Sequence, residues 1–241
     1  MQEKCRGVVL NAIKYNDRTT IVRVFTDRLG LVAFAVAAGS GRGTRQRLSQ
    51  LMPLSLVAME VGQRPGRELA TMRDLRTLYA LSGVYGNPVK NAIALFVSEV
   101  LAHCIQQQER DEALFAYVDA CVRLLDGMDS GVANFHICFM YHLGAHLGIQ
   151  PDLDTYRDGY WFDMLGGVFV PPYSPGAHML EADDARVIRL LSRMTFANMH
   201  RFRFTHDQRN RVLDTILSYY QLHNSTLGTL RSPDVLRQLF V

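Results

Sequence analysis

The sequence predicts an α+β protein in which a small β-barrel, residues 1–80, precedes a helical domain, residues 81–241. The hydrophobic pattern favours this division, because it has the period of strands in the first part and the period of helices in the second. The charge favours it too. Residues 1–80 hold 13 lysines and arginines against six acidic residues, a net charge of +7, whereas residues 81–241 carry −4. A chain of 241 residues is long enough for two such domains.

Short apolar or alternating segments separated by turn residues predict strands in the first part. The sequence Asp27-Arg28-Leu29-Gly30 predicts a tight turn, in which Gly30 is free to take a positive φ. Five strands in about 80 residues are typical of the OB-fold, a Greek-key barrel that often binds oligonucleotides. The expected strands are 6–13, 19–25, 31–37, 54–61 and 68–79.

A glycine-rich basic segment, 39–47, follows the third expected strand. Its glycines match neither G-x-x-x-x-G-K-[ST] nor a G-x-G-x-x-G ahead of an evident helix. No acidic residue lies between Asp27 and Glu60 to neutralise its arginines, Arg42, Arg45 and Arg47. We therefore expect a flexible basic loop that contacts nucleic-acid phosphates. The alternative is a solvated loop whose charge is incidental.

Beyond residue 86 the hydrophobic residues recur with a helical period, and Asn87-Pro88 is a start signal for the first helix. Residues 149–180 interrupt this pattern with glycines, prolines and aromatic residues. Within them, 160–162 and 168–170 flank Gly166-Gly167 and predict a small β-hairpin. The expected helices are 89–107, 112–125, 133–147, 181–194, 207–223 and a short one within 232–240.

The candidates for catalysis or metal binding are weak. His142 and His146 stand four apart on one helix face, but Leu143 replaces the glutamate of H-E-x-x-H, so packing is the favoured interpretation. The aspartates within 152–158 do not have the spacing of a calcium loop. A hydrolase that uses the histidine-rich helical domain would need a pocket where histidines and aspartates converge. It stays a minor alternative, and we expect no enzyme activity.

The sequence also predicts where in the cell the protein is located. No stretch approaches the roughly 20 apolar residues of a membrane span, and the start turns polar too soon for a secretory signal. None of the four cysteines is in a C-x-x-C pair, so a reduced intracellular protein with buried thiols explains them best. The cysteines are Cys5, Cys104, Cys121 and Cys138. We expect a cytoplasmic location.

Guanidinium groups and phenyl rings alternate near residue 200. An apolar surface with nearby arginines can capture an acidic peptide that ends in an aromatic residue. The alternative is a connection between helices with solvated arginines. The residues of this candidate peptide site are Arg201, Phe202, Arg203, Phe204, Arg209 and Arg211.

The chain begins with GVVLNAIKYNDRTTIVRVFTDRLGLVAFAVAAGSGR and LSQLMPLSLVAMEV. Its helical part contains KNAIALFVSEVLAHCI, LFAYVDACVRLLD and HLGIQPDLD, followed by the hairpin with two glycines. In this order and spacing the segments resemble the bacterial RecO family of recombination mediators, over nearly the whole chain.

The resemblance implies an N-terminal OB-fold, a C-terminal helical domain, and a function in DNA repair and recombination. It implies binding of single- and double-stranded DNA and annealing of complementary strands. It also implies that, with RecR, the protein helps load RecA onto DNA covered by the single-stranded-DNA-binding protein SSB. The acidic, Phe-ended tail of SSB would bind the candidate peptide site, and the protein would be associated with the nucleoid.

The chain departs from the family pattern at a zinc site. Many relatives carry four cysteines after the PDLD-like motif, near positions occupied here by Tyr156, Asp158, Gly159, Val170 and Tyr173. Without thiolates, tetrahedral zinc cannot form there, so we expect no metal and no cofactor. An apolar cluster is expected in its place, formed by Tyr160, Trp161, Phe162, Phe169 and Tyr173.

The expected mechanism is binding, in which basic side chains neutralise phosphates and release counterions. Holding two strands on basic surfaces lowers their mutual repulsion and favours annealing. Tyr15 could stack on bases, whereas Phe25 is expected in the core. The alternative is an adaptor that binds only protein. The side chains expected to contact DNA are Lys14, Arg18, Arg23, Arg42, Arg45, Arg47, Arg64 and Arg67.

Overall fold

The computed structural model describes residues 2–39, 41–62, 68–105, 109–173 and 176–239. Contacts between residues divide the chain into two compact units. The first comprises Met1–Met128 and Leu230–Leu236, and the second comprises Asp129–Thr229 and Arg237–Val241. The predicted boundary at residue 80 follows the change from strands to helices, whereas the first unit also includes the helices up to residue 128.

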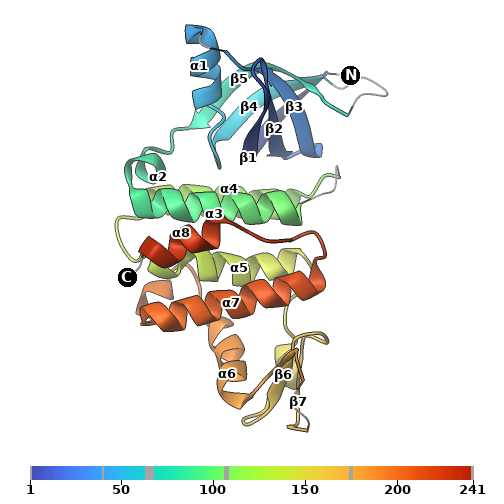
Figure 1. The fold of residues 1–241 in the computed structure, drawn as a ribbon, viewed down its shortest axis with the longest axis vertical. Helices are drawn as coiled ribbons and strands as arrows, with labels where there is room; N and C mark the ends of the chain where they lie inside the picture. Colours follow the sequence, from blue (N-terminus) through green and yellow to red (C-terminus); the bar gives the residue numbers. More distant parts are fainter. Residues whose placement is uncertain (1, 40, 63–67, 106–108, 174–175, 240–241) are drawn as a thin grey trace. The chain divides into compact units, whose positions relative to one another are not determined.

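Five antiparallel strands form the barrel of the first unit (Figure 1). The strand order is β3-β2-β1-β4-β5, and a parallel bridge between Phe34 and Ala70 joins β3 to the start of β5. The predicted five-stranded OB-fold barrel is therefore confirmed. The strands are β1 (Gln2–Asn16), β2 (Thr19–Thr26), β3 (Gly30–Ala37), β4 (Leu56–Gly62) and β5 (Thr71–Tyr79).

The barrel interior is filled by alternate residues of these strands, among them Val9, Val24 and Phe34. Gly7 is required there, because a Cβ atom would clash with Val24. At the predicted turn between β2 and β3, Gly30 has a φ of 62°. Its carbonyl accepts a hydrogen bond from the Thr26 hydroxyl at 2.9 Å, so the predicted tight turn is confirmed.

The prediction of a flexible basic loop after β3 is wrong, because residues Arg42–Ser49 form helix α1. Arginine, glutamine and leucine are good helix formers, and the glycines at its start hid that propensity. The helix buries none of its residues fully, and Leu48 packs partly against the barrel core. Figure 1 shows α1 beside β5, at the other end of the barrel from α3 and α4.

The first unit also contains α2 (Ser82–Gly86), α3 (Pro88–Cys104), α4 (Glu112–Gly127) and the first part of α8 (Ser232–Leu239). The predicted start signal of α3 is confirmed, because the Asn87 side chain accepts hydrogen bonds from the next two free backbone N–H groups. The Ser98 hydroxyl donates to the Leu10 carbonyl of β1, which ties α3 to the barrel. Phe25 and Phe115 then bring α4 against β2, with ring centroids 5.7 Å apart.

The second unit is mainly helical, with a three-stranded sheet of order β7-β6-β8. The predicted hairpin is confirmed, and Gly167 in its turn has a φ of 67°. The third strand, β8, was not expected. The elements are the 3-10 helices Val132–Asn134, Leu153–Thr155 and Met199–Arg201, the helices α5 (Phe135–His146), α6 (Ala182–Leu191) and α7 (His206–His223), and the strands β6 (Trp161–Asp163), β7 (Val168–Val170) and β8 (Met179–Leu180).

An aromatic cluster lies in the segment where the sequence predicts an apolar cluster in place of a zinc site. Phe162 and Phe169 are buried, with ring centroids 4.9 Å apart. Tyr156 packs edge-on against Phe169 at 5.0 Å. Tyr173 was wrongly assigned to this cluster, because its side chain is 69% exposed. Two prolines follow β7 directly, so the chain leaves the sheet before Tyr173 can turn inward.

Candidate nucleic-acid interface

The β1–β2 hairpin carries exposed basic and aromatic side chains. Lys14 pairs with Thr20, and Asn16 pairs with Thr19, so Tyr15 is the extra residue of a β-bulge. Bulges bend a strand and redirect a side chain. Here Tyr15 is 74% exposed. The Lys14 ammonium makes an exposed ion pair at 2.7 Å with Asp17, so part of its charge is neutralised.

Arg23, which was predicted to contact DNA, makes a structural contact instead, and Phe25 lies in the core. A guanidinium nitrogen of Arg23 donates to the Ala102 carbonyl at 3.3 Å, which satisfies an acceptor near the end of α3. Phe25 is 1% exposed and belongs to the core, as predicted. Arg18 is exposed at the start of β2, and its side chain is available to solvent.

Helix α1 presents its arginines in two ways. Arg42 and Arg45 are exposed. Arg47 is half-buried and donates to the Met72 carbonyl of β5 at 2.6 Å, so it fastens the helix to the barrel. The other two predicted residues, Arg64 and Arg67, lie outside the described residues.

Sequence reasoning missed two exposed arginines of β5, Arg73 and Arg76. They are three apart, so a regular strand would point them to opposite faces. The pairing skips a residue: Glu60 of β4 faces Arg73 and Ala58 faces Arg76, with a bulge in β5 between them. Asp74, within this bulge, has a φ of 47°. The extra residue lets both arginines reach solvent, and only three-dimensional pairing reveals it.

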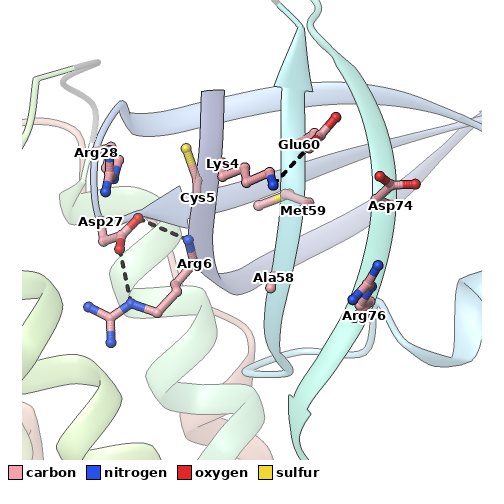
Figure 2. Close-up of a pocket in the computed structure, with 10 residues that line it drawn as sticks. All are labelled: Lys4, Cys5, Arg6, Asp27, Arg28, Ala58, Met59, Glu60, Asp74 and Arg76. Carbon is pink, nitrogen blue, oxygen red and sulfur yellow. Dashed lines mark hydrogen bonds and ion pairs between the residues drawn. The ribbon is translucent and has the colours of Figure 1, made fainter. Parts of the chain in front are cut away.

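A pocket of about 360 Å³ opens on the outer wall of β1, β4 and β5 (Figure 2). Its charges are largely balanced. The Arg6 guanidinium lies 3.0 Å from the Asp27 carboxylate, and the Lys4 ammonium lies 3.9 Å from Glu60. Arg76 also lines it.

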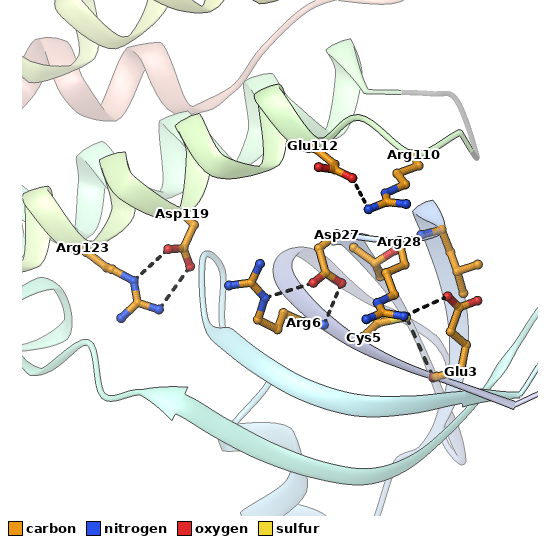
Figure 3. Close-up of polar contacts among 11 residues, drawn as sticks. Glu3, Cys5, Arg6, Asp27, Arg28, Arg110, Glu112, Asp119 and Arg123 are labelled. Atoms are coloured by element: carbon orange, nitrogen blue, oxygen red, sulfur yellow. Dashed lines mark hydrogen bonds and ion pairs between the residues drawn. The ribbon is translucent and has the colours of Figure 1, made fainter.

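The balanced charges continue toward α4 (Figure 3). Arg123 donates to Asp119 at 2.8 Å, and Arg110 forms an ion pair with Glu112. Guanidiniums with carboxylate partners attract phosphate less than unpaired ones do. The side of the first unit that carries α1 is therefore the stronger candidate for a polyanion.

A second groove, between α1 and β5, has a volume of about 540 Å³. Arg47 and Arg73 line it together with one carboxylate, Asp74. Among the described residues, neither Arg73 nor the exposed arginines of α1 has an ion-pair partner within 4.0 Å. Among the described residues, this groove and α1 therefore carry exposed arginines without an ion-pair partner.

The candidate peptide site lies in the second unit. Arg201, Arg203 and Arg211 are exposed. The half-buried Phe202 and Phe204 lie with ring centroids 6.4 Å apart. The structure therefore places two phenyl rings next to solvent-exposed arginines.

Arg209 has a different place in this site. Its guanidinium donates to the Asn134 side chain at 3.2 Å and to the Phe204 carbonyl at 3.1 Å, and burial lowers its pKa. Burial, and then the charge of Arg209, lower the pKa of His136 to about 3, so that ring is neutral. Arg209 thus fixes the segment that carries the rings.

Comparison with protein families extends over both units. Residues 1–80 match the family model described as Recombination protein O N terminal, and residues 86–226 match Recombination protein O C terminal. The chain belongs to the recombination protein O (RecO) family.

Full-length relatives have the same family name. The chain is 34% identical over 242 residues to "DNA repair protein RecO" of Bacteroides fragilis (strain YCH46), with 100% of both chains covered. It is 31% identical over 240 residues to the protein of that name from Azobacteroides pseudotrichonymphae genomovar. CFP2, again covering 100% of each. A relative from Flavobacterium psychrophilum is 26% identical over 241 residues, with 100% of both chains covered.

In this RecO-family chain, His142 makes a packing contact as predicted, whereas His146 is exposed. The His142 ring nitrogen Nε2 lies 2.8 Å from the Met194 carbonyl. Cys5, Cys121 and Cys138 are buried as predicted, and Cys104 is half-buried. Burial raises the pKa of the Cys104 and Cys121 thiols to about 12, so they are protonated at neutral pH. Within the described residues, no helix is long and apolar enough to cross a membrane.

Proposed function

We propose that this protein is a DNA repair and recombination mediator that acts by binding DNA. Its relatives are named as DNA repair proteins, and they match the chain along its whole length. The observation that carries the proposal is the set of exposed arginines on α1 and β5 that lack ion-pair partners among the described residues. Unpaired guanidiniums on a small barrel are suited to phosphates of either single- or double-stranded DNA.

Binding of this kind explains annealing without catalysis. Arginines that neutralise phosphates of two strands reduce the repulsion between them, so complementary strands pair more readily. We further propose that, with RecR, the protein helps load RecA onto DNA covered by SSB, and that it acts at the nucleoid in the cytoplasm. The residues proposed to contact phosphates are Lys14, Arg18, Arg42, Arg45, Arg73 and, outside the described residues, Arg64 and Arg67.

The experiment is a salt series of single-strand binding, measured by the fluorescence anisotropy of a labelled oligonucleotide. Affinity should fall steeply with salt and depend little on sequence. Replacing Arg42 and Arg45 with Ala should reduce the log–log slope by about 1 for each phosphate that is no longer neutralised. The matched control is Arg110→Ala, which removes an exposed arginine that already has a carboxylate partner. Absence of DNA binding at low salt would favour the adaptor that binds only protein.

The phenyl rings and arginines of the second unit favour a further partner, the acidic tail of SSB. Its carboxylates would pair with Arg201, Arg203 and Arg211, and its terminal ring would contact Phe202. A labelled tail peptide should bind wild type more tightly than Arg203→Ala. Equal binding by both proteins would place the peptide site elsewhere. Arg209→Ala tests positioning instead, because it removes bonds that hold the ring segment.

A further inference from the structure

The groove between α1 and β5 is unusual for a place where a helix meets a barrel. Such a helix face is ordinarily apolar. The face of α1 that lines this groove presents two amides, a guanidinium and a glycine, spaced so that they share one side of the helix. These residues are Gln46, Gln50, Arg47 and Gly43.

The guanidinium of Arg47 is incompletely satisfied. One terminal nitrogen donates to the Met72 carbonyl at 2.6 Å. Its Nε atom is buried and has no hydrogen-bond partner among the described residues. Buried donors without a partner destabilise a fold and are rare in native proteins, where a bound group often accounts for them. A ligand that draws the guanidinium toward the groove would relieve this cost.

The opposite wall is the bulge of β5. Asp74, with a φ of 47°, lies in the part of the left-handed region that residues other than glycine seldom adopt. Strain of this kind and β-bulges are both concentrated at binding sites. The bulge places Arg73 and Asp74 along the groove, so a cation and a hydrogen-bond acceptor stand opposite the amides of α1.

We propose that this groove holds one nucleotide unit of single-stranded DNA, with the phosphate between Arg47 and Arg73. The base would lie against Gln46 and Gln50, whose amides donate and accept and so can pair with any base edge. An unpaired strand is required if the amides bond the Watson–Crick edges, because base pairing in a duplex occupies those edges. The inference rests on the DNA binding proposed above and assigns it a point of contact.

The first test fills the groove without removing charge. A Cβ atom on Gly43 would meet nothing within 4 Å, so the side chain of Gly43→Leu can extend into open space. Leucine is also a better helix former than glycine, so the fold should not weaken. The Kd for a labelled single-stranded oligonucleotide should rise about tenfold or more, the effect of one charge-assisted contact. Ser49→Leu, on another side of α1, adds similar bulk and should bind like wild type.

The second test uses opposite charges on the same wall. Arg73→Ala should weaken binding and reduce the salt slope by about 1. Asp74→Gly should strengthen binding, because it removes a carboxylate near the phosphate, and glycine tolerates the positive φ. Melting temperatures and far-ultraviolet circular dichroism of each variant show whether the fold is retained.

The outcomes separate the two proposals. If wild type does not bind the oligonucleotide at low salt, the proposed function fails. If wild type binds and Gly43→Leu binds equally well, the groove proposal is overturned and the proposed function stands. A deoxynucleoside monophosphate should displace the oligonucleotide only at far higher concentration. Displacement at concentrations similar to those of the unlabelled oligonucleotide would mean that the groove takes a free nucleotide and would overturn its assignment to DNA.

Discussion

Replacing Tyr15 with Ala should weaken binding of single-stranded DNA and leave the stability of the fold unchanged. The bulge at the tip of the β1–β2 hairpin leaves Tyr15 74% exposed. Folding therefore buries little of it, and an aromatic side chain kept in water contributes little to the free energy of unfolding. The same exposure makes the ring accessible to a base.

The magnitude follows from stacking. One base on one aromatic ring contributes about 1–3 kcal/mol, so the Kd should rise roughly 5- to 150-fold. Because Tyr15 is uncharged, the slope of log Kd against log salt should stay the same. Lys14→Ala, next to it, should reduce that slope and cause a smaller loss of affinity, since Lys14 is already paired with Asp17.

The assay is the anisotropy titration described above, at several salt concentrations. Tyr15→Phe retains the ring and should restore binding. A Tyr15→Ala variant that binds like wild type, with an unchanged melting temperature, would refute the stacking role of the hairpin. A change in salt slope would also contradict it, because it would point to an altered electrostatic surface.

Three further predictions concern stability. Burial raises the pKa of Glu99, but hydrogen bonds from Ser232 and the Arg231 backbone outweigh it and lower that pKa below its usual value. The ionised Glu99 carboxylate therefore stabilises the fold above the pKa that it has in the unfolded chain, and this stabilisation is lost as the pH falls through its pKa in the folded protein. Glu99→Gln should reduce the melting temperature at neutral pH and make that temperature depend less on pH in the acid range. Gly83→Ala should destabilise by about 1–3 kcal/mol in urea unfolding, because its Cβ would clash with the Asp126 carbonyl, whereas an unchanged midpoint would contradict that close packing. Finally, a metal chelator should leave the melting temperature unchanged, and elemental analysis that finds one zinc per chain would disprove the assignment of the aromatic cluster as its replacement.

The strands and main helices could be predicted because their hydrophobic periods are regular. Helix α1 could not, because its glycines and arginines obscure a helix that buries none of its residues fully. The same limit applies to the candidate interface. Arg42 and Arg45 were identified from charge alone, but Arg73 and Arg76 depend on a bulge that exists only once β4 and β5 pair. Arg23 and Arg47 have the same charge as their neighbours, and only the structure shows that they bond to backbone carbonyls.

The return of residues 230–236 to the first unit affects how the chain folds as it leaves the ribosome. Pro233 and Leu236 are buried, and the Glu99 carboxylate accepts the Ser232 N–H at 2.8 Å. The barrel strands are all synthesised by residue 79, so the barrel can close early. The helices packed against it complete their packing only after nearly all of the chain has been translated. Pairing between segments so far apart in sequence raises the contact order and makes full stability of the first unit a late event.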